Sequence, residues 1–199
     1  MEKPAANKYE INPLIKRRWS PRAFEDKMVE KEKLQRIFEA ARWSPSSFNQ
    51  QPWKYIVGIK GTNSYDKIME TLIEFNQNWA ILAPVLVMVI GKETDAKNKT
   101  NATYQYDTGQ SIAYLTLQAM HEGLFMHQMS GFKKSKAIDN FSIDKDHKPI
   151  AVFALGYGSS PEKLPGSFQE MEKSERTRNN FDDFVFEENF GKASSLFNP

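Results

Sequence analysis

Residues 85–91 read VLVMVIG and follow directly after Pro84. The run is continuously apolar and rich in valine and isoleucine, a pattern typical of a strand buried on both faces of a sheet. Working outward from this run, further strands are predicted at residues 54–60 (KYIVGIK), 124–129 (LFMHQM) and 148–158 (KPIAVFALGYG). We therefore expect one sheet with residues 85–91 as its central strand.

Helices are predicted between these strands, over residues 30–42, 63–75 and 105–123. The first has its apolar residues at helical spacing. Asn63 and Ser64 are candidate caps for the second, and Gly123 suits the C-terminal end of the third. Because strands alternate with helices, the sequence predicts a three-layer arrangement. No repeat or linker divides the chain, so we expect one domain over residues 1–199.

The composition excludes several classes of protein. The 27 Lys and Arg are balanced by 25 Asp and Glu, so a net charge of +2 predicts neither a nucleic-acid partner nor an anionic membrane surface. The absence of cysteine excludes disulfides, thiolate nucleophiles and iron–sulfur clusters. The three histidines lack metal-ligand spacing, and no metal site is predicted. Without a signal-peptide core or a membrane-length apolar stretch, the chain is expected to be soluble and cytoplasmic.

A basic motif, RRWSPRAF, occupies residues 17–24. Its three guanidiniums suit phosphate, which arginine binds bidentately, and Ser20 adds a neutral donor. The alternative is a solvated basic helix end.

A second motif, SPSSFNQQPW, occupies residues 44–53. It is rich in turn formers and offers hydroxyls, amides and main-chain donors, but no acid or base. This inventory suits hydrogen bonding to a polyhydroxyl chain or to the edge of a heteroaromatic ring. The alternative is a purely structural loop.

Taken in order, RRWSPRAF, an amphipathic helix and ARWSPSSFNQQPW resemble the start of the nitroreductase family. The resemblance continues through EFNQNWAILAPVLVMV (residues 74–89), YDTGQSIAYLTLQAMHEGLFMHQMSGF (residues 106–132) and the basic pair Arg176 and Arg178. It therefore covers nearly the whole chain.

This resemblance implies an α+β fold of three layers, in which a central, mainly antiparallel sheet is flanked by helices. It also implies a homodimer with FMN at the subunit interface. The aromatic tail of residues 175–199 is expected to extend onto the partner subunit, because its phenylalanines need a surface to cover.

The resemblance also assigns roles to individual residues of the FMN site. Arg18 and Ser20 are expected to hold the phosphate together with Arg176 and Arg178, and Arg22 and Asn76 to meet the pyrimidine end of the ring. The main chain of Met129, Ser130 and Gly131 is expected to lie against N5 and O4. The other subunit is expected to supply Ser46, Ser47, Asn49 and Gln51. Trp19 and Pro45 belong to the same two motifs and complete the predicted set.

The sequence departs from relatives at positions that bear on substrate preference. Trp79 stands where some members have a lysine, and we regard it as a candidate flavin or substrate contact. Ser130 stands where some have glutamate. The segment between Gly91 and Tyr104 is short, which predicts a more open site.

The implied function is transfer of electrons from NAD(P)H to a nitroaromatic, quinone or similar small acceptor by a ping-pong mechanism. The cofactor carries this chemistry, so no catalytic side chain is predicted. The alternatives are an FMN-binding redox sensor or flavin store, a specialised flavin-fragmenting or dehalogenating relative, and an interaction domain without a cofactor. Gly156-Tyr157-Gly158 begins like a dinucleotide fingerprint but lacks its third glycine, so a strand-ending turn is expected there.

Overall fold

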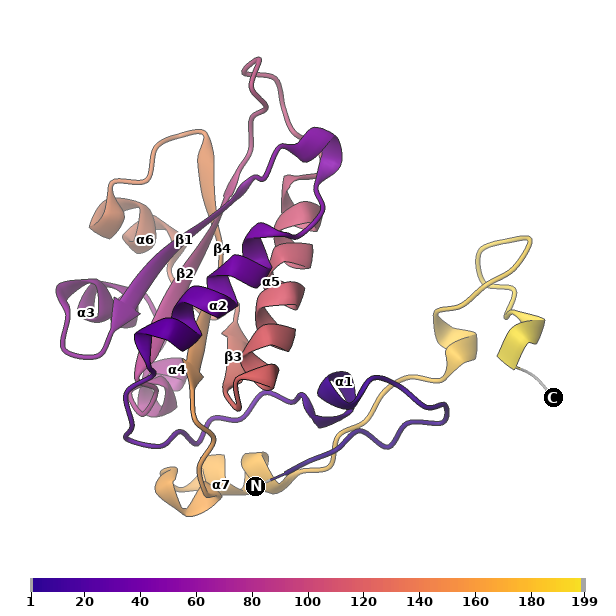
Figure 1. The fold of residues 1–199 in the computed structure, drawn as a ribbon, viewed down its shortest axis with the longest axis horizontal. Helices are drawn as coiled ribbons and strands as arrows, with labels where there is room; N and C mark the ends of the chain where they lie inside the picture. Colours follow the sequence, from indigo (N-terminus) through magenta and orange to yellow (C-terminus); the bar gives the residue numbers. More distant parts are fainter. Residues whose placement is uncertain (1, 198–199) are drawn as a thin grey trace.

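The computed structural model describes residues 2–197, and within that range it centres on a four-stranded sheet in the order β1-β2-β4-β3 (Figure 1). The strands are β1 (Trp53–Ile59), β2 (Val85–Lys92), β3 (Phe125–Met129) and β4 (His147–Gly156). All three pairings between neighbouring strands are antiparallel. The predicted antiparallel sheet is therefore confirmed, with residues 85–91 on one of its two inner strands.

β2 is buried on both faces, because its side chains alternate between two hydrophobic cores. Val85, Val87 and Val89 belong to one core, and Leu86, Met88 and Ile90 belong to the other. The first core is completed by α2 (Lys31–Arg42) and α5 (Tyr104–His121). The second is completed by α3 (Asn63–Met69), α4 (Glu74–Ala80) and α6 (Lys134–Phe141). The three predicted layers are thus present.

α5 is the longest helix in the described range, at 18 residues, which corresponds to a length of about 27 Å. It ends at His121, and Gly123 then adopts a φ of 76°. A left-handed conformation at this place is characteristic of a glycine that stops a helix, so the predicted end of α5 is confirmed.

The helix predicted over residues 63–75 is wrong in its length. The hydroxyl of Thr62, rather than Asn63 or Ser64, accepts from a main-chain N–H of the first turn. α3 ends at Met69, because residues 70–73 are recruited by the segment after β3. Leu72 forms a β-bridge with Phe132, and the N–H of Ile73 donates to the carbonyl of Gly131 at 3.2 Å. A new helix, α4, then begins at Glu74.

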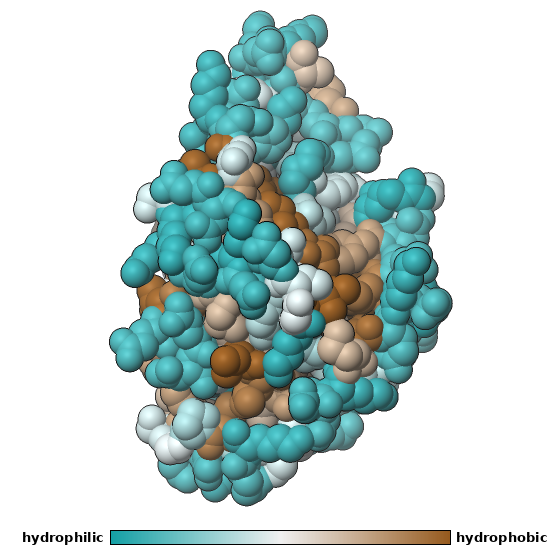
Figure 2. All heavy atoms as spheres, turned by 90° about the vertical axis from the view of Figure 1, so that its left-hand side faces the viewer, coloured by the Kyte–Doolittle hydropathy of each residue, from teal (hydrophilic) through white to brown (hydrophobic). Residues whose placement is uncertain are grey.

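Apolar side chains reach the surface beside α4 and α6. The exposed ones are Ile73, Phe75, Ile81 and Ile138. Figure 2 shows this side of the molecule, where hydrophobic residues gather in a band between hydrophilic ones. The surface next to α4 is therefore apolar.

The two ends of the chain run side by side away from the sheet (Figure 1). Before the sheet comes α1 (Pro13–Arg17), and after it comes α7 (Ser167–Lys173), followed by residues 174–197, which we call the C-terminal arm. The rings of Phe181 and Phe197 in this arm stack at 4.1 Å, and Tyr9 lies 5.5 Å from Phe181. The aromatics of the arm thus pack on one another and on the N-terminal segment. Within residues 2–197, no helix combines the length and apolar character needed to cross a bilayer.

His127 on β3 is a partly buried titratable group whose protonation affects the stability of the fold. Its ring centroid lies 4.4 Å from that of Trp79, and its Nδ1 lies 3.0 Å from the carbonyl oxygen of Pro21. Burial lowers the pKa of His127 to about 4, and the charge of Arg22 contributes to the same effect.

We expect His127 to destabilise the fold in mild acid. Its pKa in the folded state lies below the ordinary value of 6.5, so the unfolded chain takes up the proton first. The neutral His127 therefore makes its full contribution to the free energy of unfolding above about pH 6.5. This contribution, roughly 3 kcal/mol, is lost as the pH falls towards about 4. Urea unfolding across this range should show a steeper decline for the wild type than for His127→Phe, which keeps a ring against Trp79. The exposed His121, replaced by Gln, is the control, and equal declines for wild type and His127→Phe would contradict the prediction.

Candidate functional site

Residues of the predicted phosphate site line one pocket of about 400 Å³. α1 ends at Arg17, and the main-chain N–H of Arg18 still donates to the carbonyl of Leu14 at 2.9 Å. The chain is extended at Arg18, whose guanidinium donates to Oγ of Ser20 at 3.2 Å. From the predicted set, the lining includes Arg18, Trp19, Ser20, Arg22, Arg176 and Arg178.

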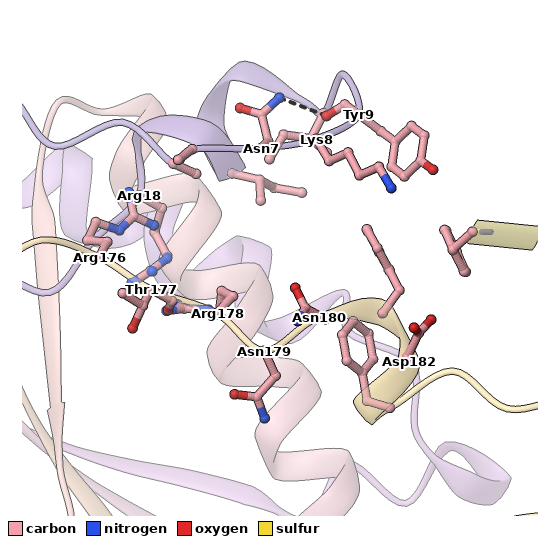
Figure 3. Close-up of a pocket in the computed structure, with 17 residues that line it drawn as sticks. Asn7, Lys8, Tyr9, Arg18, Arg176, Thr177, Arg178, Asn179, Asn180 and Asp182 are labelled. Atoms are coloured by element: carbon pink, nitrogen blue, oxygen red, sulfur yellow. Dashed lines mark hydrogen bonds between the residues drawn. The ribbon is translucent and has the colours of Figure 1, made fainter. Parts of the chain in front are cut away.

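Positive charge exceeds negative charge in this pocket, whose lining holds Lys3 and four arginines against the two carboxylates of Glu172 and Glu175. Arg18, Arg176 and Arg178 converge where the C-terminal arm passes the N-terminal segment, and all three also line a neighbouring pocket of about 850 Å³ (Figure 3). Burial lowers the pKa of the Arg18 guanidinium, and the charges of Arg176 and Arg178 lower it further. Within the described residues, none of these three guanidiniums forms a salt bridge. Such a cluster suits a multivalent anion such as phosphate.

Arg22 is half-buried at the inner side of the same pocket. Its Nε has no hydrogen-bond acceptor among residues 2–197, and its guanidinium lies 6.0 Å from the centre of the Trp79 ring. Trp79 itself is fully buried and does not line the pocket. The structure therefore places Trp79 behind Arg22 as a support, rather than at the surface as a ligand contact.

Asn76 and Gly131, predicted to meet the ring of the cofactor, are in contact. Nδ2 of Asn76 donates to the carbonyl of Gly131 at 3.0 Å. A Cβ at position 131 would lie 2.6 Å from that nitrogen and 2.8 Å from the side chain of Ile73, so the approach requires glycine. Met129 is buried at the end of β3, whereas Ser130 is exposed.

The arginine pocket and the Asn76–Gly131 contact are linked through Trp79. Trp79 lies one turn after Asn76 on α4, on the same face of the helix, and it supports Arg22. His127 contacts Trp79, and Met129 follows His127 on the same face of β3. The structure thus brings together the predicted residues of the N-terminal motif, α4, β3 and the C-terminal arm.

The second motif forms a tight loop whose main chain is unusual. Phe48, Asn49 and Gln51 all have a positive φ, at 49°, 54° and 48°. The loop is held from within, because Oγ of Ser46 accepts from the N–H of Gln51 at 3.0 Å. It is held from outside by the carboxylate of Asp107 on α5, which accepts from the N–H of Ser47 at 3.2 Å. Pro45, Asn49 and Gln51 are exposed.

Within one subunit this loop and the arginine pocket lie far apart. The loop contacts Asp107 in the first turn of α5. Trp19 of the pocket packs against Phe125, which follows the other end of α5, at a ring distance of 6.3 Å. The stretch of α5 from Asp107 to His121, about 21 Å long, therefore separates the two motifs (Figure 1).

The sequence analysis missed several residues near the site, among them Lys3, Asp107 and Glu172. Lys3 and Glu172 line the arginine pocket, and Asp107 holds the loop. Glu172 follows Phe168 by four residues on α7, so its place on the buried face of that helix was a usable signal. Nothing in the sequence distinguishes Lys3 from an ordinary surface lysine.

The glycine-rich segment after β4 is structural. β4 ends at Gly156, as predicted for a strand-ending turn. Gly158 forms a β-bridge with Phe24, and a Cβ there would lie 2.9 Å from the Phe125 ring. Glycine at position 158 therefore allows the main chain to pack closely against Phe125. The described residues contain no group of three His, Asp or Glu side chains able to hold a metal ion.

Comparison with known proteins agrees with this geometry. The sequence model of the nitroreductase family matches residues 15–78, which include both motifs. A Stenotrophomonas maltophilia R551-3 protein, provisionally named NADH dehydrogenase/NAD(P)H nitroreductase, is 27% identical over 175 residues, 78% of this chain and 88% of that protein.

Two solved structures extend the comparison along the chain. An oxidoreductase containing FMN is 34% identical and has a TM-score of 0.86, covering 94% of this chain and 96% of that one. A nitroreductase family protein from Clostridium difficile 630 is 29% identical, with a TM-score of 0.69 over 88% of this chain and 96% of its own. The chain described here belongs to the nitroreductase family.

Proposed function

We propose that this protein is an FMN-dependent oxidoreductase that takes electrons from NAD(P)H and passes them to a small acceptor such as a nitroaromatic compound or a quinone. Donor and acceptor use the same place in turn, as in a ping-pong mechanism. The proposal is supported by the solved relative that contains FMN and by the Stenotrophomonas relative named for NAD(P)H. The observation that carries it is the convergence of Arg18, Arg176 and Arg178, of which Arg18 and Arg176 are partly buried and none forms a salt bridge within the described residues.

A phosphate group fits the charge of this pocket. Arg18, Arg176 and Arg178 provide guanidinium donors, and the hydroxyl of Ser20 lies beside Arg18. The mutual repulsion of the guanidiniums is relieved when a phosphate dianion enters, so binding energy comes from charge that the fold alone leaves unbalanced.

The groups around Arg22 suit the ring end of the same cofactor. Bound FMN supplies the hydride-transfer chemistry. In our proposal Arg22 offers positive charge and donors to the pyrimidine edge, Asn76 supports the main chain at Gly131, and residues 129–131 face the ring. The exposed Ile73 and Phe75 next to Asn76 provide an apolar rim for an aromatic acceptor.

The SPSSFNQQPW loop completes the site, in this proposal, from a second copy of the chain. The loop is too far from the arginines of its own subunit, and its exposed polar side chains lie at the opposite end of α5. We also propose that the C-terminal arm lies against the partner. Phe184, Phe190 and Leu196 in the arm are exposed in the single subunit and would be covered there.

The purified protein is expected to show flavin absorption bands that bleach when NAD(P)H is added without oxygen. Bleaching would demonstrate the cofactor and the reductive half of the reaction together. Bands that persist with both NADH and NADPH would point instead to an FMN-binding sensor or store. A protein that remains colourless after FMN is supplied would overturn the proposal.

Arg18→Ala is expected to weaken FMN binding about 10- to 100-fold, the range for loss of a charge-assisted hydrogen bond. The adjacent Arg17 is the matched control, because it is exposed and pairs only loosely with Glu2 at 3.6 Å. Arg17→Ala should bind FMN as the wild type does. Quenching of FMN fluorescence on titration measures both, and equal loss in the two variants would contradict the assigned phosphate site.

Mixed dimers test whether the site is shared between subunits. One subunit carries Arg18→Ala, and the other carries Asn49→Gly with Gln51→Gly, since glycine tolerates the positive φ at these positions. Each variant alone is expected to bind FMN weakly at both sites. In the mixed dimer, one site receives both defects and the other receives none, so one tight FMN site should return.

Purification through two different affinity tags isolates the mixed dimer for this measurement. If each site were built within one subunit, the mixed dimer would contain no intact site and would bind FMN as weakly as its parents.

A further inference from the structure

Glu172 is a buried carboxylate beneath the N-terminal motif. It lies on α7 and is 1% exposed. Its Oε1 accepts from the N–H of Arg22 at 2.8 Å and from the N–H of Ala23 at 3.1 Å, and its Oε2 lies 3.1 Å from the same Arg22 nitrogen. The carboxylate therefore fixes the main chain at the point where Arg22 leaves it.

The carboxylate holds the Arg22 guanidinium by charge rather than by a hydrogen bond. The distance from Oε2 of Glu172 to Nη1 of Arg22 is 3.9 Å, whereas a charge-assisted hydrogen bond spans about 2.7–2.9 Å. Since the carboxylate oxygens are directed to main-chain N–H groups, the hydrogen-bonding capacity of the guanidinium stays available to a ligand. A bidentate Arg–Glu pair would have consumed it.

The other neighbours of Arg22 add no second negative charge. The Trp79 ring lies on one side of the guanidinium, and His127, whose low pKa keeps it neutral at neutral pH, packs against that ring. Lys3 is cationic, and its ammonium donates to the main-chain carbonyls of Glu172 and Ser174. Glu172 is therefore the acidic side chain that Arg22 pairs with in the described structure.

α7 packs against α4, and this packing fixes the position of Glu172 next to Arg22. Phe168, one turn before Glu172, packs against Phe75 of α4 with ring centroids 5.0 Å apart. α4 carries Trp79, which supports Arg22 from the other side. Arg22 is thus held between two helices that contact each other.

We propose that Glu172 is a positioning residue that orients Arg22 towards the cofactor and sets the net charge which a bound flavin experiences. This inference rests on the proposed FMN function. Arg22 stabilises negative charge on the reduced ring, and the carboxylate of Glu172 moderates that effect. The contact thereby tunes how easily the cofactor is reduced.

Glu172→Gln separates charge from geometry, because the amide oxygen can still accept from the N–H groups of Arg22 and Ala23. We expect it to bind reduced FMN more tightly relative to oxidised FMN, by about tenfold, which for a two-electron couple is a positive shift of about 30 mV in midpoint potential. The measurement is the equilibrium midpoint potential of the bound FMN, together with the dissociation constant of oxidised FMN.

Glu170→Gln is the matched control. Glu170 lies on the same helix, carries the same charge, is exposed and pairs with Lys173 at 3.5 Å. It should leave the potential unchanged. An equal shift in both variants, or a loss of affinity for FMN in Glu172→Gln with no shift in potential, would overturn the proposal. A wild-type protein that binds no FMN would overturn the proposed function and this inference with it, whereas flavin binding with an unchanged potential would overturn the inference alone.

The double variant Arg22→Gln/Glu172→Gln removes both charges and leaves neither unpaired. It provides a folded reference if Glu172→Gln alone is unstable. In the Arg22→Gln background, Glu172→Gln should still shift the ratio of the two FMN affinities in favour of reduced FMN, because the carboxylate charge that it removes also acts on the flavin directly. An unchanged ratio in that background would also overturn the proposal.

Discussion

The burial of β2 on both faces is the constraint from which the remaining architecture follows. A strand without a polar face needs a hydrophobic cover on each side, and its alternating side chains divide the core into two. α2 and α5 supply one cover, and α3, α4 and α6 supply the other. With β2 paired to β1 and β4, β3 falls at the edge of the sheet, where its last residues can turn towards α4.

This layering determines where the two halves of the proposed site lie. Trp79 and Asn76 come from the layer of α4, together with the end of β3 and the N-terminal motif. The SPSSFNQQPW loop follows α2 and is fixed to the far end of α5 by Asp107. Because both layers pack on the same sheet, a small loop movement does not close the distance between them. This separation of the two motifs within one subunit is what supports the shared site that we propose.

The elements that sequence patterns predicted best are those whose signal is local. VLVMVIG identified β2, because a strand that is buried on both faces is continuously apolar. Gly123 identified the end of α5, because a left-handed residue at the end of a helix is usually glycine. The end of α3 at Met69 has no such local signal, since it arises from a β-bridge between Leu72 and Phe132, sixty residues apart. The partners of Glu172 could not be predicted for the same reason, because Arg22 and Ala23 lie about 150 residues away in the chain.

The residues of the proposed site were predicted from a family resemblance. Their physical explanation comes from the free energy by which they destabilise the isolated subunit. Phe48 is almost fully exposed and adopts a left-handed conformation, which is unfavourable for a bulky side chain by about 1–2 kcal/mol. Arg18, Arg176 and Arg178 repel one another in a partly desolvated pocket. Neither feature contributes to the two hydrophobic cores, and each is unfavourable to the isolated subunit. Features that a fold does not need and that weaken it are retained where a ligand or partner offsets the cost. Here the anion would offset the repulsion, and the second subunit would give the strained loop a surface to contact, so both costs point to one liganded dimer.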